Sequence, residues 1–361
     1  MAKRLRTSGW ARIFKRSMTV LARSGMKAAR QSVRQALKPA PLKKPASANK
    51  LRRLAAKPTT PAPPLQGAGW TQGVAVGAAG ARRYALFRPT GASAADKLPL
   101  LVMLHGCGQD AKGFAQSTRM NAVAAREGFM VLYPEQDRLA NPQGWWNWFD
   151  SAGGRALKEA ALIQRAIDQV CQLHGADPGR VAIAGLSAGA SMAALVVTRH
   201  PDRFKAVAMH SGVAPGTAHS ALSALGAMQG RRSTRALPKP PAATVTLTLT
   251  AAAAWPPLLV IHGSADRVVA ARNGQAAAQQ WADAAGAKSG PARNVQRGQR
   301  YAMTVADFKR RGRLAVSRVQ VAGLGHAWSG GLSSLPYGDS QGPDASRLGW
   351  AFVNKQFKLT R

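Results

Sequence analysis

Short aliphatic runs alternate with helix-length amphipathic segments from about residue 70 to the end of the chain. The aliphatic runs predict strands over 83–87, 100–104, 129–133, 181–184, 206–209, 258–261 and 314–321. Apolar residues at helical spacing predict helices over 155–174, 188–200, 274–285 and 346–357. Continuous aliphatic strands that alternate with helices are typical of a parallel sheet buried on both faces. We therefore expect an α/β fold with a mostly parallel central sheet and helices on both faces, forming one domain over residues 67–361.

The pattern breaks down over residues 211–257. Residues 229–257 read QGRRSTRALPKPPAATVTLTLTAAAAWPP and are low in complexity. Thr244–Thr250 alternates like a strand, but Pro and Ala tracts surround it. We interpret 211–257 as an irregular insertion or lid.

Residues 1–66 have a different composition from the rest of the chain. Residues 1–60 hold 17 Lys and Arg residues and no acidic residue, and the first acidic residue is Asp96. Residues 1–38 have the spacing of a basic amphipathic helix. Such a helix could lie on an anionic membrane, a lipid-coated granule or nucleic acid, and a solvated, poorly ordered tail is the alternative. Residues 39–66, rich in Pro, Ala and Lys, are typical of a linker.

The overall composition narrows the chemistry. The formal net charge is +36, and the two cysteines, Cys107 and Cys171, allow at most one disulfide. The cysteines lack the spacing of a zinc site and no H-E-x-x-H motif is present, so we expect no metal. No apolar run reaches the ~18 residues of a membrane span. The run Met18–Ala22 is too short for the core of a standard secretory signal.

The sequence Gly185-Leu186-Ser187-Ala188-Gly189 matches G-x-S-x-G between a predicted strand and a predicted helix. A sharp turn from strand to helix brings neighbouring backbone close, and glycines on either side of the serine avoid collision. The turn lifts the serine hydroxyl above the sheet, where it can attack a carbonyl. An ordinary helix cap formed by Ser187 is the alternative, and the strand and helix around the motif favour a nucleophile.

A serine hydroxyl needs a base, and that base needs an orienting acid. His326 stands in a glycine-rich loop after the strand predicted over 314–321, and Asp266 follows the strand predicted over 258–261. The order Ser187, Asp266, His326 is the order that this strand–turn–helix motif uses. Asp283 and Asp307 are weaker candidates for the acid, because one lies inside a helix and the other precedes a basic run.

An oxyanion formed at the attacked carbonyl needs two amide donors. The amide of Ala188, directly after the serine, is one candidate. The other should come from the loop His105–Asp110, which follows the strand predicted over 100–104. His105 itself is better suited to supporting this loop than to proton transfer.

Six motifs together resemble a known family: LHGCGQD, YPEQDRLANPQGWWNWFD, GLSAGASMAAL, HSGVAPG, HGSADRVVAARNG and GHAWSGG followed by PYGDSQGPDASR. They are similar to the short-chain polyhydroxyalkanoate depolymerases, also called poly(3-hydroxybutyrate) depolymerase family esterases, of the α/β-hydrolase superfamily. The resemblance covers about residues 70–357. It implies an α/β-hydrolase fold and a cofactor-independent serine hydrolase that cleaves esters of hydroxyalkanoate polymers or oligomers.

The resemblance also implies roles for individual residues. It gives Ser187 as the nucleophile, Asp266 as the acid and His326 as the base, with the backbone amides of Cys107 and Ala188 as oxyanion donors. It implies an extracellular enzyme, although the basic N-terminal segment without a signal pattern leaves a cytoplasmic or granule-associated location as the alternative. No stable protein partner is expected.

The chain departs from the family pattern at Trp145, where the family commonly has a cysteine that could bridge to the position of Cys107. A disulfide is therefore not expected there. The neighbouring tryptophans raise two alternatives, an apolar wall for a neutral substrate or plain core packing. As a substrate wall we expect four residues, His105, Trp146, Trp148 and Trp328.

Other functions stay open at this point. Feruloyl or acetyl esters of plant polysaccharide, small carboxylic esters and peptides could be cleaved by the same groups. A binding protein that attaches to nucleic acid or anionic lipid through residues 1–60 belongs to a different class. The intact serine, acid and histidine motifs favour an enzyme.

Overall fold

The computed structural model of the chain describes residues 69–93, 95–238 and 255–359, which belong to one compact unit spanning Gly67–Arg361. The predictions for residues 1–66, an amphipathic basic segment followed by a linker, lie outside the described residues. The strand-like alternation of residues 244–250 also lies outside them.

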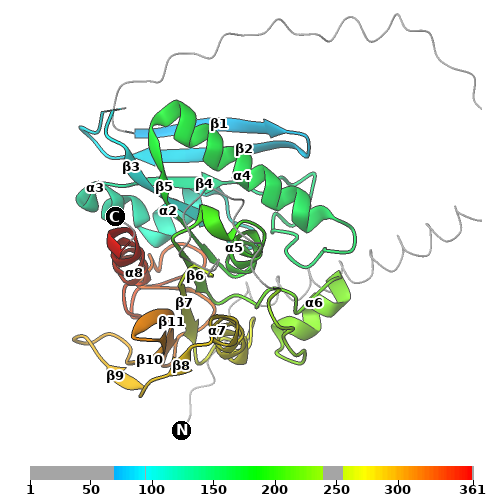
Figure 1. Cartoon of the computed structure of the whole chain (residues 1–361), viewed down its shortest axis with the longest axis vertical. Helices are drawn as coiled ribbons and strands as arrows, with labels where there is room; N and C mark the ends of the chain where they lie inside the picture. The colour runs from blue at the N-terminus through cyan, green and yellow to red at the C-terminus, as the bar shows by residue number, and fades with distance from the viewer. Residues whose placement is uncertain (1–68, 94, 239–254, 360–361) are drawn as a thin grey trace, which may run out of the picture. The chain divides into compact units, whose positions relative to one another are not determined.

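A single twisted sheet runs through the described part of the molecule (Figure 1). It has 11 strands, and the order across it is β1-β2-β4-β3-β5-β6-β7-β11-β10-β8, with β9 also paired to β10. The strands are β1 (Gly69–Gly77), β2 (Gly80–Arg88), β3 (Leu98–Leu104), β4 (Met130–Pro134), β5 (Ala176–Leu186), β6 (Ala206–His210), β7 (Leu258–Gly263), β8 (Lys288–Ser289), β9 (Arg293–Val295), β10 (Met303–Arg310) and β11 (Arg313–Val321). A separate ladder joins β12 (Trp328–Ser329) to β13 (Gly338–Asp339).

The centre of the sheet is parallel and its edges are antiparallel. Strands β4, β3, β5, β6, β7 and β11 pair in parallel, whereas β1 and β2 at one edge and β10, β8 and β9 at the other pair antiparallel. The central strands are almost wholly buried, which explains why their sequences are continuous aliphatic runs instead of alternating ones. Because they are parallel, their carboxyl ends meet at one edge of the sheet.

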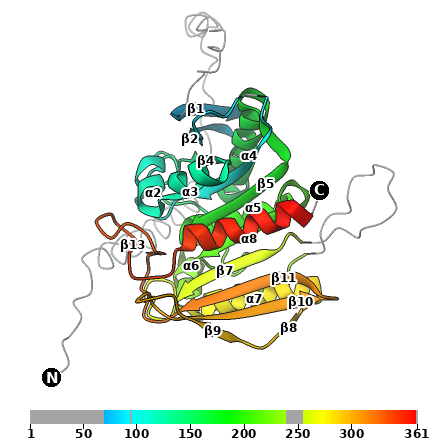
Figure 2. The same cartoon turned by 90° about the vertical axis from the view of Figure 1, so that its left-hand side faces the viewer.

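Helices cover both faces of this sheet. They are α2 (Ala111–Thr118), α3 (Met120–Glu127), α4 (Arg155–His174), α5 (Ala188–Arg199), α6 (Ala221–Met228), α7 (Arg272–Ala285) and α8 (Ala345–Leu359), with a 3₁₀ turn at Pro201–Arg203. Helices α3 and α8 contact each other on one face, and α4 and α5 contact each other on the opposite face. In Figure 2, α8 crosses in front of the central strands, and α7 lies behind β10 and β11.

Helix α4 shows how the sequence pattern produces an element. Its buried residues recur three and four positions apart and form one stripe that packs on β1, β2 and β5. The helix ends at Gly175, which adopts the left-handed backbone conformation with φ 70° that suits a glycine after a helix. The predicted helix over 155–174 has the same bounds.

The predicted fold class is therefore correct, and each strand and helix predicted within the described residues overlaps an observed one. The antiparallel strands β1 and β10 were not predicted, and neither were the short helices α2 and α3. Strand β1 contains Gly69, Gly73 and Gly77, residues that are depleted in strands. Strand β10 has three buried positions among half-buried ones, Met303, Ala306 and Phe308, and ends in a basic run, so it lacks the aliphatic signal of the central strands.

The segment predicted as an irregular insertion or lid over 211–257 contains one regular element among its described residues, helix α6. Ser220 caps this helix by accepting a hydrogen bond from the amide of Ser223. Its role as a lid stays a prediction.

None of the helices in the described ranges combines the length and apolarity needed to cross a bilayer. Within the same ranges, no group of three or more His, Cys, Asp or Glu side chains is arranged to hold a metal ion.

Candidate active site

The residues that the sequence analysis singled out for catalysis lie beyond the carboxyl ends of four central strands. Ser187 directly follows β5, Asp266 follows β7, His326 follows β11, and the loop that begins at His105 follows β3. Parallel pairing of β3, β5, β6, β7 and β11 brings these strand ends to the same edge of the sheet. The topology thus gathers residues that are far apart in sequence.

Ser187 occupies a strained turn between β5 and α5. Its φ of 57° and ψ of −120° are unusual for a residue with a side chain. Its amide donates to the carbonyl of His210 at 2.8 Å, which holds the turn against the end of β6. Strain of this kind is maintained where the surrounding structure fixes the backbone, and it is common at functional sites.

The flanking glycines are required by close backbone contacts. A Cβ atom at Gly185 would lie 2.4 Å from the carbonyl carbon of Gly189, and one at Gly189 would lie 2.1 Å from the carbonyl oxygen of Leu104. Both contacts are with backbone, which cannot move aside. The G-x-S-x-G pattern is thus the sequence signature of a helix that starts directly against two strands.

The side chains of Ser187, His326 and Asp266 form one hydrogen-bonded chain. The Ser187 hydroxyl lies 2.9 Å from His326 Nε2, and His326 Nδ1 lies 2.8 Å from Asp266 Oδ2. Because a carboxylate only accepts, Nδ1 carries the proton, and Nε2 is left to accept from the serine. Ser187 is buried, with 5 % of its surface exposed.

The second oxygen of Asp266 is also fixed. Asp266 Oδ1 accepts from the amides of Val268 and Val269, each at 2.9 Å. Burial alone would raise the pKa of this carboxyl, but His326 together with hydrogen bonds from His262 and His326 holds the pKa well below its usual range. The acid is therefore an anion that faces the imidazole with one defined oxygen.

The two weaker candidates for the acid lie elsewhere. Asp283 is on the exposed side of α7, where its carboxylate accepts from Gln279. Asp307 is on β10 and binds Arg293 and Ser317.

The two amides predicted as oxyanion donors lie at the start of α5 and in the turn after β3. Ala188 is the first residue of α5, and the amides in the first turn of a helix have no partner within the helix. Cys107 is in the turn after β3, in which the amide of Gln109 donates to the carbonyl of Gly106 at 3.3 Å. Their role as donors stays a prediction.

His105 fixes the peptide unit that contains the Cys107 amide. His105 Nε2 accepts from the amide of Gln136 at 3.1 Å, so the ring proton is on Nδ1. That proton is donated to the carbonyl oxygen of Gly106 at 2.8 Å. The Gly106 carbonyl and the Cys107 N–H belong to one planar peptide, so holding the oxygen also sets the direction of the N–H.

The predicted substrate wall needs correction at His105 and Trp146. His105 is 1 % exposed and Trp146 is fully buried, so neither lines an open pocket. The Trp146 indole N–H donates to the His105 carbonyl at 3.1 Å, and its ring lies 5.5 Å from the His105 ring. Trp146 therefore packs against His105 inside the protein and stabilises the loop after β3.

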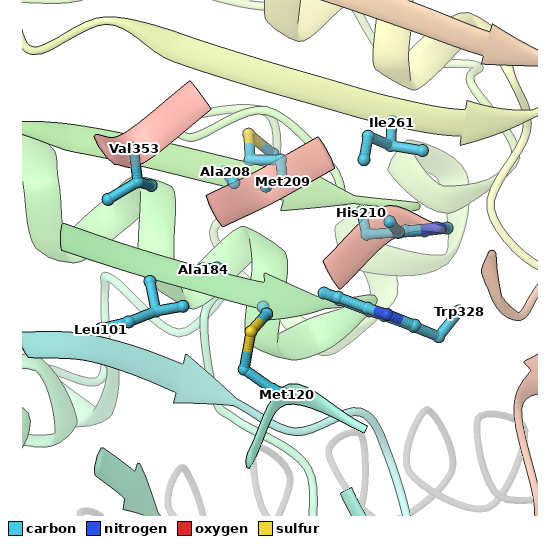
Figure 3. Close-up of a pocket in the computed structure, with 12 residues that line it drawn as sticks. Leu101, Met120, Ala184, Ala208, Met209, His210, Ile261, Trp328 and Val353 are labelled. Atoms are coloured by element: carbon cyan, nitrogen blue, oxygen red, sulfur yellow. The ribbon is translucent and has the colours of Figure 1, made fainter. Parts of the chain in front are cut away.

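Trp328 also belongs to the interior. Its ring stacks on His210 with centroids 5.0 Å apart, and its N–H donates to Ser346 Oγ on α8. Figure 3 shows both rings at one end of a small apolar pocket between the sheet and α8. For Trp328, core packing is therefore the correct alternative. Trp148 is 8 % exposed and packs edge-on against Phe149, and its place in a substrate pocket stays a prediction.

A buried polar cluster beneath the β3 loop was not predicted. The Glu159 carboxylate, from the buried stripe of α4, accepts from Gln136 Nε2 and from both the amide and the side chain of Asn147. Arg82 is also buried, donates to the Gln136 side chain and lies over the Trp146 ring. An acidic residue on the apolar stripe of a helix was the available signal, because such a residue must find partners inside.

Cys107 and Cys171 are free thiols. Burial raises the pKa of the Cys107 thiol to about 12, so it stays protonated near neutral pH. This agrees with the absence of the bridging cysteine at position 145.

Because His105 and His210 are buried, we expect the free energy of unfolding to fall in acid. Burial lowers the pKa of His105 to about 4, and burial, followed by His262 and His326, lowers that of His210 to about 3. The unfolded chain binds these protons near pH 6.5 and the folded chain does not, so stability is fully present above pH 6.5 and is lost as the pH falls toward 4 and 3. Between pH 7 and pH 4, protonation of each histidine in the unfolded chain lowers the free energy of unfolding by about 3 kcal/mol.

Urea unfolding at intervals from pH 7 to pH 4 measures this loss. His210→Gln should make the dependence on pH shallower, whereas His219→Gln, at an exposed position, should leave it unchanged. An equally steep dependence in His210→Gln would contradict the assignment.

Comparison with known proteins assigns the chain to a family. The family model described as "Esterase PHB depolymerase" matches residues 82–298, more than half of the chain. Poly(3-hydroxyalkanoate) depolymerase C of Paucimonas lemoignei is 33 % identical over 180 residues, which cover 48 % of this chain and 42 % of that protein. Feruloyl esterase B of Neurospora crassa is 29 % identical over 202 residues, which cover 53 % of this chain and 67 % of that protein. The chain thus spans less than half the length of the first relative.

A solved structure supports the fold. Acetyl xylan esterase from Aspergillus awamori superposes with a TM-score of 0.55 at 18 % identity, over 72 % of this chain and 94 % of that one. The matched region of the family model includes Ser187 and Asp266 but ends before His326, which the fold returns to the same site. The chain has an α/β-hydrolase fold and belongs to the Esterase PHB depolymerase family.

Proposed function

We propose that the protein is a serine esterase that hydrolyses ester bonds of polyhydroxyalkanoate, such as poly(3-hydroxybutyrate) or its oligomers, through an acyl-enzyme. The observation that carries the proposal is the hydrogen-bonded chain from Ser187 through His326 to Asp266 at the carboxyl edge of the sheet. The family and the poly(3-hydroxyalkanoate) depolymerase relative support the choice of substrate.

In this mechanism His326 Nε2 takes the proton of Ser187 as the oxygen attacks the ester carbonyl. Asp266 stabilises the imidazolium that forms. The amides of Cys107 and Ala188 bind the oxyanion, and one such donor accounts for about 2.7–4 kcal/mol of barrier reduction. His326 then gives its proton to the leaving alcohol, and a water molecule, activated by the same imidazole, releases the acid from Ser187. No cofactor takes part in this scheme.

Covalent labelling tests the nucleophile. The protein is treated with a fluorophosphonate and the adduct is located by peptide mapping. We expect a single adduct on Ser187 in the wild type and none in Ser187→Ala. Ser191→Ala is the matched control, because Ser191 lies one turn further along α5 and is also buried. An adduct on a different residue of the wild type would falsify the assignment of Ser187.

A second substrate class is favoured by a specific similarity. The match between this chain and feruloyl esterase B covers two thirds of that enzyme's length. Clearing of a poly(3-hydroxybutyrate) suspension, measured beside release of ferulate from methyl ferulate, separates the two substrates. Faster ferulate release with no clearing would favour the feruloyl ester.

The proposal includes action outside the cell. Activity in the culture medium and in cell fractions tests it, and activity confined to the cytoplasm or to granules would contradict it. Attachment of residues 1–60 to an anionic surface is a separate prediction. It is tested by comparing the full chain with a chain that starts at Gly67 for binding to anionic vesicles and to DNA.

A further inference from the structure

Tyr337 is next to the base of the candidate site, although the sequence analysis did not single it out. Its ring meets the His326 imidazole edge to face, with centroids 6.1 Å apart and an interplanar angle of 86°. The side chain is half-buried and rests partly on the hydrophobic core. It therefore contacts the ring that exchanges the serine proton.

Tyr337 also lies near the loop proposed to bind the oxyanion, because Gln109 of that loop donates to the carbonyl of Pro336, the residue before the tyrosine. Burial, with a smaller contribution from the Cys107 thiol, raises the pKa of Tyr337 to about 12. The tyrosine is thus neutral near neutral pH. A side chain that contacts His326 and directly follows a residue bonded to the oxyanion loop borders the space that the reacting ester must occupy.

The backbone holds Tyr337 in an unfavourable conformation. Its φ is 61°, in the left-handed region that aromatic residues rarely adopt. Its carbonyl accepts from the amide of Trp328 at 2.6 Å, and a Cβ atom on the next residue, Gly338, would lie 2.0 Å from the carbonyl oxygen of Leu332. Strain that the surroundings fix in this way is concentrated at functional sites.

The loop of Tyr337 is also joined to the loop that follows β3. Gln109 accepts from the amide of Gly106 at 2.9 Å through Oε1, and its Nε2 donates to the carbonyl of Pro336 at 3.4 Å. One side chain therefore links the residue before Tyr337 with the residue before Cys107. The position of the tyrosine ring is set relative to the oxyanion loop as well as to the base.

The contact with the imidazole indicates which part of an ester the ring would meet. His326 must deliver its proton to the leaving alcohol oxygen, so the alcohol part of the substrate lies beside the imidazole. The Tyr337 ring packs against that imidazole and would therefore meet the alcohol part. In a polyhydroxyalkanoate that alcohol is secondary, because the carbon that bears the oxygen also bears an alkyl group. A flat neutral ring at this position offers an apolar contact to that branch.

On the basis of the proposed function, we propose that Tyr337 is a specificity-determining residue whose ring forms the wall of the alcohol subsite and favours esters of branched, secondary alcohols. The residue contacts substrate and transfers no proton. The hydroxyl is not required for this role, so phenylalanine should replace tyrosine without loss.

Three isomeric esters test the inference, with acid release followed by pH-stat. sec-Butyl butyrate carries a branch on the alcohol, n-butyl isobutyrate carries it on the acid, and n-butyl butyrate carries none. Tyr337→Ala should lower kcat/KM about 10-fold for sec-butyl butyrate and by less than about 3-fold for the other two esters, the size expected for a lost apolar contact. Tyr337→Phe should keep all three within about 2-fold, because it retains the ring.

The ratio between two esters does not depend on how much of a variant is folded, so a partly unstable variant still gives a result. Tyr337→Leu provides a second variant without the ring. Tyr301→Ala is the matched control and should leave the ratios unchanged, because it removes a different tyrosine, whose hydroxyl donates to Gln341 in the segment after Tyr337. Equal losses for the three esters, or the largest loss for the isobutyrate, would overturn the inference. If the wild type hydrolyses none of them and Ser187 is not labelled, the proposed function fails and the inference with it; hydrolysis without selectivity in Tyr337→Ala refutes the inference alone.

Discussion

Replacement of Asp266 by Asn is expected to lower kcat about 10⁴-fold with little change in KM. Asp266 Oδ1 accepts from two backbone amides, so the oxygen of the asparagine must stay at that position. The NH₂ group then faces His326 Nδ1, which must become an acceptor. The ring proton moves to Nε2, and the imidazole can no longer take the proton of Ser187.

Steady-state hydrolysis of p-nitrophenyl butyrate measures this effect, and thermal unfolding shows whether the variant is folded. Asp283→Asn is the matched control, because Asp283 is exposed on α7, and its kcat should stay within about 2-fold of the wild type, as for most surface substitutions. A folded Asp266→Asn variant that loses less than tenfold in kcat would show that another group orients the base.

Replacement of His105 by Phe should lower kcat about 10²–10³-fold, the cost of one oxyanion donor. The Nδ1–H of His105 holds the Gly106 carbonyl at 2.8 Å, and phenylalanine fills the same space without a donor. The Gly106 carbonyl then keeps only its longer hydrogen bond from the Gln109 amide, at 3.3 Å, so the direction of the Cys107 amide is less firmly fixed. Because an oxyanion exists only in the transition state and intermediate, the loss should fall on kcat and leave KM nearly unchanged.

His105→Asn is the control that separates positioning from packing. The asparagine amide places an N–H close to the position of Nδ1 and can donate to the same carbonyl. It should recover at least about tenfold of the kcat that His105→Phe loses, because one positioned hydrogen bond is restored. If Phe and Asn variants of equal stability have the same kcat, His105 has only a structural role.

Local pattern was sufficient for the central part of the fold. The buried parallel strands are continuous aliphatic runs, and α4 carries one apolar stripe between recognisable ends, so both could be read without knowledge of their neighbours. The antiparallel strands β1 and β10 escaped prediction because one is rich in glycine and the other has only three fully buried positions before a basic run. Their pairing partners, more than their own composition, make them strands.

Chain order was sufficient to select Ser187, Asp266 and His326, because each lies within five residues after a strand of the parallel sheet and such strand ends meet at one edge. The roles of Trp146, Trp328 and Tyr337 could not be assigned in this way. An aromatic side chain near a site motif has the same sequence signal whether it packs below a loop or borders a substrate. Which loops touch, and which side of a ring stays open, depends on the packing of segments distant in sequence.

The amino-acid sequence thus established the parallel core, the strained serine turn and the identity of the three groups that meet there, since these follow from hydrophobic period, glycine placement and strand order. The folded structure alone established the hydrogen bond from His105 to the Gly106 carbonyl, the Glu159 cluster beneath it and the contact of Tyr337 with His326. His105 is adjacent to Gly106, but its ring is oriented by Gln136, 31 residues away, and Glu159 lies 12 and 23 residues from its partners. Because each contact depends on how separate segments pack together, no local pattern in the chain encodes it.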